Sequence, residues 1–194
     1  MILLDTSVLI NLFNVSKKWV KKFASCTSRS LCREEKLKRE FEEKEKNKEF
    51  KKYLDGIEYI TYEELSTTEF VEFMQLMDEI KKDDNALRSL QLGNKTKFSL
   101  EDLRNEVKAL SNEDIYLLTW ARFLFEKQKK DTIVATDDNR ILEFCENRYG
   151  IDYICSFRVV KEIKACDFDR AKEICYKKKI PVYESRIRKN RVAL

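Results

Sequence analysis

The chain has 194 residues and a mass of 23.2 kDa, enough for one domain with a sizeable core. It contains no histidine, which excludes a Ser-His-Asp triad, a cysteine–histidine pair and a histidine general base. Without histidine, any hydrolytic chemistry would have to use carboxylates. Charged residues make up 38% of the chain, and it has only three glycines and one proline, so we expect long helices.

The positive charge is concentrated at the C-terminal end. The net charge is +4, but residues 177–194 carry seven basic side chains against Glu184, which gives this segment +6 and leaves −2 for the rest. Such a segment indicates an anionic partner such as a nucleic acid, and a solvated tail explains it almost as well. The basic side chains are Lys177, Lys178, Lys179, Arg186, Arg188, Lys189 and Arg191.

The six cysteines never approach C-x-x-C spacing, and without histidine they do not match a zinc site. Buried, reduced thiols are the simplest explanation for them. No basic leader precedes the first apolar run, and no apolar stretch reaches membrane-spanning length. We therefore expect a soluble, cytoplasmic protein without a membrane partner.

The first apolar run, Ile2–Leu4, is continuous, which is typical of a strand covered on both faces of a parallel sheet. It stops at Asp5, and a second apolar stretch opens at Val8, so the pattern predicts strand, acidic turn and helix. Ligand sites of such sheets lie outside the carboxyl ends of the strands, where Asp5 would lie. Capping of the helix by Asp5 or Thr6 is the simpler alternative.

Residues 31–54 are dense in charge, with acidic and basic residues four apart, and they predict a solvated helix. A strand is predicted at 57–60. A capping box from Thr61 to Glu64 then predicts the start of a helix that extends to Ile80.

Polar residues 81–97 predict a loop with a short helical piece. The remaining expected elements are a helix from Ser99, a helix opened by a capping box at Ser111–Asp114, a strand at 132–135 ending in Thr136-Asp137-Asp138, an amphipathic helix, a strand at 151–155, and one further helix within 159–179.

Carboxylates recur where the predicted strands end or the predicted helices begin: Asp5, Glu64, Asp114 and the Asp137–Asp138 pair. Each has an adequate explanation as a helix cap. Together they predict more, because helices that follow parallel strands open at one edge of the sheet. Converged carboxylates repel one another unless a cation is bound, and all-oxygen ligands suit Mg²⁺ or Mn²⁺. The pattern therefore indicates metal-dependent phosphodiester hydrolysis.

These segments, in this order, resemble the PIN-domain nucleases. The residues that carry the resemblance are Leu4-Asp5-Thr6-Ser7-Val8-Leu9-Ile10, Ile60-Thr61-Tyr62-Glu63-Glu64-Leu65, the helix at Asp114 and Val134-Ala135-Thr136-Asp137-Asp138. The resemblance implies a three-layer α/β/α fold with a central, mostly parallel sheet. It assigns residues 1–155 to the core, including the charged helix at 31–54 and an insertion at 81–112, and leaves 156–194 as a C-terminal helix and basic tail.

The resemblance also implies roles for particular residues. Asp5, Glu64, Asp114 and Asp138 are the expected catalytic acids. Asp5, Asp114 and Asp138, with Asp137 as an acceptable neighbour, are the expected ligands of Mg²⁺ or Mn²⁺, supported by Thr136 and Ser7. Glu63 and Glu69 compete with Glu64 for the second acid.

The implied activity is that of an endoribonuclease, as in VapC-type toxins and RNA-processing enzymes. RNA, chiefly single-stranded, is the expected substrate, with Arg186, Arg188, Lys189 and Arg191 as candidate phosphate contacts. A homodimer, an antitoxin-like inhibitor or a processing complex are the expected protein partners. The insertions and the basic tail depart from compact toxins and favour a processing role.

Two other functions fit parts of the pattern. A catalytically silent RNA-binding or scaffold subunit would retain the same fold. A phosphatase of the HAD type also places an aspartate after its first strand, but it needs a second aspartate two residues later, where this chain has Ser7.

Overall fold

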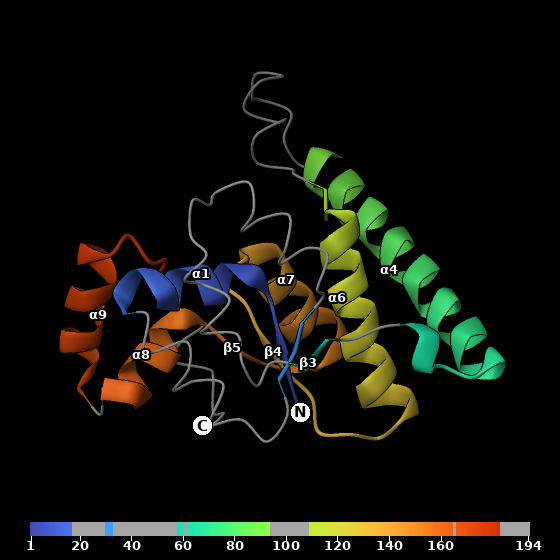
Figure 1. Ribbon diagram of the computed structural model, residues 1–194. Helices are drawn as coiled ribbons and strands as arrows, with labels where there is room; N and C mark the ends of the chain where they lie inside the picture. The colour runs from blue at the N-terminus through green and yellow to red at the C-terminus, as the bar shows by residue number, and fades with distance from the viewer. Residues whose placement is uncertain (17–29, 33–57, 60–61, 94–108, 165, 183–194) are drawn as a thin grey trace, which may run out of the picture.

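The computed structural model describes residues 1–16, 30–32, 58–59, 62–93, 109–164 and 166–182, and it shows a parallel sheet covered by helices (Figure 1). The five strands have the order β3-β2-β1-β4-β5, and every neighbouring pair is parallel. Their bounds are Ile2–Leu4 for β1, Ser30–Cys32 for β2, Glu58–Tyr59 for β3, Ile133–Ala135 for β4 and Asp152–Ile154 for β5. The predicted α/β class with a parallel sheet is confirmed.

The register of β1 against β4 determines which residues meet at the carboxyl edge. Leu4 is paired with Ala135, so Asp5 and Thr136 leave their strands side by side. The backbone amide of Asp5 donates to the carbonyl of Ala135 at 2.8 Å, and that of Thr136 donates to Ile154 of β5 at 3.0 Å. Backbone pairing therefore continues past the ends of the strands.

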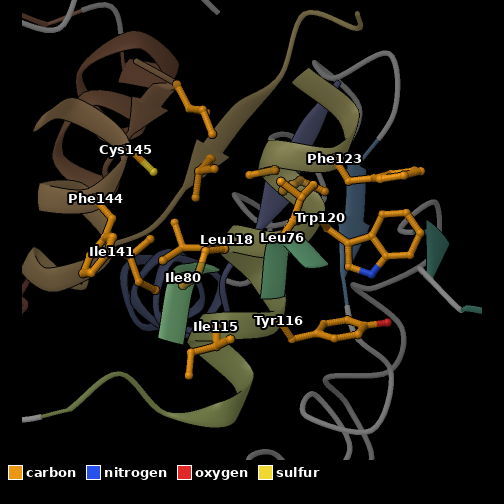
Figure 2. Close-up of a cluster of buried hydrophobic side chains, with 14 of the residues drawn as sticks. Leu76, Ile80, Ile115, Tyr116, Leu118, Trp120, Phe123, Ile141, Phe144 and Cys145 are labelled. Atoms are coloured by element: carbon orange, nitrogen blue, oxygen red, sulfur yellow. The ribbon is translucent and has the colours of Figure 1, made fainter. Parts of the chain in front are cut away.

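Helices cover both faces of the sheet because successive strand residues point to opposite sides. Ile2 and Leu4 pack with α1, α8 and α9, whereas Leu3 packs with α4, α6 and α7, and Figure 2 shows part of this second cluster. The helices are α1 (Thr6–Val15), η2 (Tyr62–Glu64), α4 (Thr67–Gly93), α6 (Asn112–Arg122), η3 (Phe123–Lys127), α7 (Asn139–Phe144), η4 (Cys145–Tyr149), α8 (Ser156–Lys164) and α9 (Phe168–Lys177).

The start of the long helix α4 differs from the prediction. Glu64 belongs to the short 3-10 turn η2, and α4 begins three residues later. Its capping box is formed by Ser66 and Glu69: the Ser66 amide donates to Glu69 Oε2 at 2.9 Å, and the Glu69 amide donates to Ser66 Oγ at 3.4 Å. Two S/T-x-x-E patterns, Thr61–Glu64 and Ser66–Glu69, lie close together in the sequence, and the second one opens the helix.

The predicted loop at 81–97 is also wrong in its first part, because α4 continues to Gly93. The apolar positions Leu76, Ile80 and Leu87 follow one another at spacings of four and seven residues, which keeps them on one face of the helix against α6. Most of the polar residues between them are exposed, whereas Asp84 is buried on the same face as Ile80. Residues 94–108 lie outside the described part of the chain.

Two further expectations need correction. The helix predicted for 31–54 does not include its first residues, since Leu31 and Cys32 pair with β1 and β3 as strand β2, and residues 33–54 lie outside the described part. One helix was expected after β5, but the chain forms two, α8 and α9, which share a core with β1 and α1. Within the described residues, none of the helices combines the length and the apolarity needed to cross a bilayer.

Substitution of Phe73 tests whether α4 packs in the core. Its ring is fully buried and lies 4.8 Å from that of Trp120 and 5.8 Å from that of Tyr116. We expect Phe73→Ala to lower the free energy of unfolding by about 3–5 kcal/mol in urea titrations. The matched variant Phe70→Ala, on the same helix but 42% exposed, should cost less than about 1.5 kcal/mol. Equal losses would show that α4 does not pack as described.

Candidate functional site at the carboxyl edge of the sheet

Asp5 follows β1 and is buried, with 5% of its surface exposed. Two hydroxyl groups donate to the same carboxylate oxygen, Oδ2: Ser7 Oγ at 2.6 Å and Thr136 Oγ1 at 2.7 Å. Ser7 comes from the first turn of α1, and Thr136 from the residue after β4. The carboxylate of Asp5 is therefore held from two elements and its orientation is fixed.

Both hydroxyls also accept a backbone amide from the turn after β4. The Asp137 amide donates to Ser7 Oγ at 3.0 Å, and the Asp138 amide donates to Thr136 Oγ1 at 3.0 Å. A hydroxyl that accepts an amide hydrogen directs its own hydrogen elsewhere, here to Asp5. The turn thus determines the direction of both hydrogen bonds to Asp5.

Asp137 lies behind this arrangement and links three elements. Its Oδ1 accepts the Ser156 amide at 2.8 Å, and its Oδ2 accepts Asn11 Nδ2 at 2.6 Å together with the Ser156 hydroxyl. Ser156 is the first residue of α8, so this carboxylate also lies at a helix N-terminus, where negative charge is favoured.

Burial raises the pKa of Asp137, and the nearby charge of Asp5 acts in the same direction, against the hydrogen bonds from Ser156 and Asn11. Both oxygens of Asp137 accept protein donors. This occupancy favours a structural role for Asp137, which links the turn to α1 and α8.

Asp138 is the N-cap of α7 and is exposed. Its Oδ1 accepts the amides of Arg140 at 2.7 Å and Ile141 at 3.4 Å. Those contacts occupy one oxygen of the carboxylate. Asp138 therefore combines a fixed orientation with access from solvent, next to the turn that holds Asp5.

Asp114 lies in the first turn of α6. The predicted capping box is confirmed: Asp114 Oδ2 accepts the Ser111 amide at 3.0 Å, and Ser111 Oγ accepts the Asp114 amide at 3.1 Å. In Figure 1, α6 starts at the top beside the end of α4 and runs down toward the side where the chain begins, opposite in direction to β1. The first turn of α6, which contains Asp114, therefore lies on the carboxyl side of the sheet.

The candidates for the second acid lie elsewhere. Glu63 and Glu64 are exposed in η2, before α4. Glu69 is engaged by Ser66, and its Oε1 accepts Gln128 Nε2 at 3.4 Å, from the segment that leads to the start of β4. Among the described residues, no contact joins any of these three glutamates to Asp5. The tail residues Arg186, Arg188, Lys189 and Arg191 lie outside the described part.

The donor set fits a hard divalent cation. Within the described residues, no group of three acidic or cysteine side chains is close enough together to form a complete metal site. Mg²⁺, however, usually keeps several waters and takes one or two carboxylates plus substrate phosphates. Asp5 follows β1 and Asp138 follows the neighbouring β4 at this edge, and α6, with Asp114 in its first turn, begins on the same side.

The sequence did not identify two residues that the structure adds, Asn11 and Ser156. Asn11 lies one helical turn after Ser7, a spacing of four that places both on one face of α1. Ser156 lies two residues after the end of β5, as the first residue of α8, and a serine at the start of a helix is ordinary. For Asn11 the signal was its spacing from Ser7, and for Ser156 it was the position shortly after a strand. Strand β2 was also missed; in the sequence Arg33, Glu34 and Glu35 follow it, outside the described residues.

Burial of Asp137 predicts a pH effect on stability. Because the folded-state pKa is raised, the native state keeps its proton where the unfolded chain, with a pKa of about 3.9, has lost it, so stability falls as pH rises above that value. With EDTA present, the free energy of unfolding of the wild type minus that of Asp137→Asn should decrease from about pH 4 toward about pH 7. Urea titrations across this range measure it, and an increase would contradict the direction of the shift.

No protein-family model matches the chain, and neither the curated proteins nor the solved structures contain a match to it.

Proposed function

We propose that this chain is a divalent-metal-dependent endoribonuclease of the PIN-domain type, which hydrolyses RNA phosphodiester bonds at the carboxyl edge of its sheet. The observation that carries the proposal is the orientation of Asp5 by Ser7 and Thr136, whose hydroxyls both accept amides of the turn that contains Asp138. A carboxylate that only capped α1 would not need this support, and Asp5 makes no side-chain cap hydrogen bond to that helix.

The proposed roles follow from the positions of the side chains. Asp5 and Asp138 would hold Mg²⁺ or Mn²⁺, with Asp114 approaching from the start of α6. Such an ion supplies an activated water and stabilises the charge that develops on the phosphate oxygens. Ser7 and Thr136 keep the Asp5 carboxylate in place, and Asp137 holds α1 and α8 against the turn. Glu64 lies in η2, before α4, and this assignment gives it no role.

The substrate follows from the resemblance and from charge. The basic segment at 177–194 would contact RNA phosphates without reading sequence, a contribution that salt weakens. A cytoplasmic role in RNA processing, or in toxin–antitoxin regulation with a cognate inhibitor or a second copy as partner, belongs to this proposal.

A silent RNA-binding or scaffold subunit is the second candidate. The observation that favours it is that the described residues do not gather three carboxylates into one group. The two functions differ in one property: the nuclease cleaves RNA when metal is supplied, and the scaffold only binds it.

The first test is cleavage of a mixed single-stranded RNA with Mn²⁺, Mg²⁺ or EDTA. We expect metal-dependent cleavage that Asp5→Asn lowers more than about a hundredfold, since the loss of a ligand should exceed the 10–100-fold typical of supporting residues. Asp152→Asn, an exposed aspartate at the start of β5, is the matched control and should cleave like the wild type. RNA binding without cleavage would favour the scaffold, and cleavage that survives Asp5→Asn would exclude this site.

Thr136 provides a separate test of the supporting hydroxyls. Thr136→Val keeps the volume of the side chain but removes the donor to Asp5 and the acceptor of the Asp138 amide. We expect metal-dependent cleavage to fall about 10–100-fold, and Thr136→Ser, which retains the hydroxyl, to recover most of it. If Val and Ser variants cleave equally, the hydroxyl does not support Asp5.

A further inference from the structure

Asp84 occupies a core position on α4. The buried face of this helix carries Phe73, Leu76 and Ile80, and Asp84 follows Ile80 by four residues, which places it on the same face. Only 3% of its surface is exposed. A carboxylate at such a position costs free energy unless it is paired, so its partners should explain why it is there.

Its partners come from the starts of two other helices. Asp84 Oδ1 accepts Arg140 Nη2 at 2.9 Å. Asp84 Oδ2 accepts the amide of Leu110 at 3.3 Å, and Arg88 Nε of the same helix lies 3.3 Å from that oxygen. Leu110 directly precedes Ser111, the N-cap of α6, and Arg140 is the second residue of α7. One buried carboxylate therefore joins the N-termini of α6 and α7.

Those two N-termini carry two of the expected metal ligands. Asp114 lies in the first turn of α6, and Asp138 caps α7, where its Oδ1 accepts the amide of the same Arg140 that binds Asp84. We propose that Asp84 is a positioning residue that sets the distance between Asp114 and Asp138 and thereby the metal affinity of the edge. This inference rests on the proposed function.

Stability alone does not account for Asp84. Apolar residues that replace a buried ion pair often leave stability unchanged or raise it. The neighbouring positions Ile80 and Leu87 show that apolar side chains serve on this face of α4. What an apolar residue would not provide is a bond to the Leu110 amide and to the Arg140 guanidinium at once.

The test compares Asp84→Asn with Asp83→Asn. Asp83 is the matched control, since it also accepts a hydrogen bond, from the Tyr149 hydroxyl at 3.0 Å, and lies 3.8 Å from Arg148, but it contacts neither helix start. We expect Asp84→Asn to raise the dissociation constant of Mn²⁺, measured by water-proton relaxation, about tenfold or more, and Asp83→Asn to change it less than about twofold. Equal effects of the two variants would overturn the inference.

Hydrogen exchange provides a readout that does not depend on metal. In Asp84→Asn the Leu110 amide should exchange about tenfold faster, as expected for the loss of one hydrogen bond, whereas Asp83→Asn should leave it unchanged. If Asp84→Asn does not fold, Arg140→Gln removes the contact to α7 alone and must weaken Mn²⁺ binding in the same way.

The outcomes separate this inference from the proposed function. A wild-type protein that binds no Mn²⁺ contradicts both. A wild type that binds Mn²⁺ and cleaves RNA, with Asp84→Asn unchanged in Mn²⁺ affinity, contradicts the positioning role of Asp84 alone.

Discussion

The site depends on two hydroxyl groups that donate to one oxygen of Asp5. Ser7 and Thr136 can do so only because each accepts an amide of the turn after β4, and that turn lies beside Asp5 because β1 and β4 pair in parallel. The direction of every bond in this set follows from the backbone, which offers donors where the hydroxyls need them. A change of one residue in the pairing register would separate the hydroxyls from the carboxylate.

Two buried carboxylates connect the elements around the carboxyl edge of the sheet. Asp137 connects the turn to α1 and α8, and Asp84 connects α4 to the starts of α6 and α7. Each lies among apolar side chains, where an ionised group is tolerated only with several donors. Buried carboxylates therefore connect the elements that surround Asp5 and Asp138. The hydrophobic clusters hold the same helices on the two faces of the sheet.

The sequence predicted well what local patterns determine. The strands at Ile2–Leu4 and Ile133–Ala135 and the capping box at Ser111 followed from apolar runs and cap residues. It failed where two local signals competed, as at Ser66, and where a strand was too short to show a pattern, as in β2. Asp84 was not predictable, because its role depends on Arg140 and Leu110, which are distant in sequence. Asp5 could be singled out, but its support by two hydroxyls required the register of the strands.

A metal site at Asp5 is tested most directly by locating bound Mn²⁺ through the paramagnetic broadening of backbone amide signals in NMR spectra. We expect substoichiometric Mn²⁺ to broaden the amides of Asp5 and Ser7, of Asp137 and Asp138, and of Glu113 and Asp114 before all others, and Mg²⁺ in excess to reverse the broadening. Broadening centred on residues 127–131 at the opposite edge of the sheet, or spread evenly over the exposed aspartates and glutamates, would contradict a metal site at Asp5.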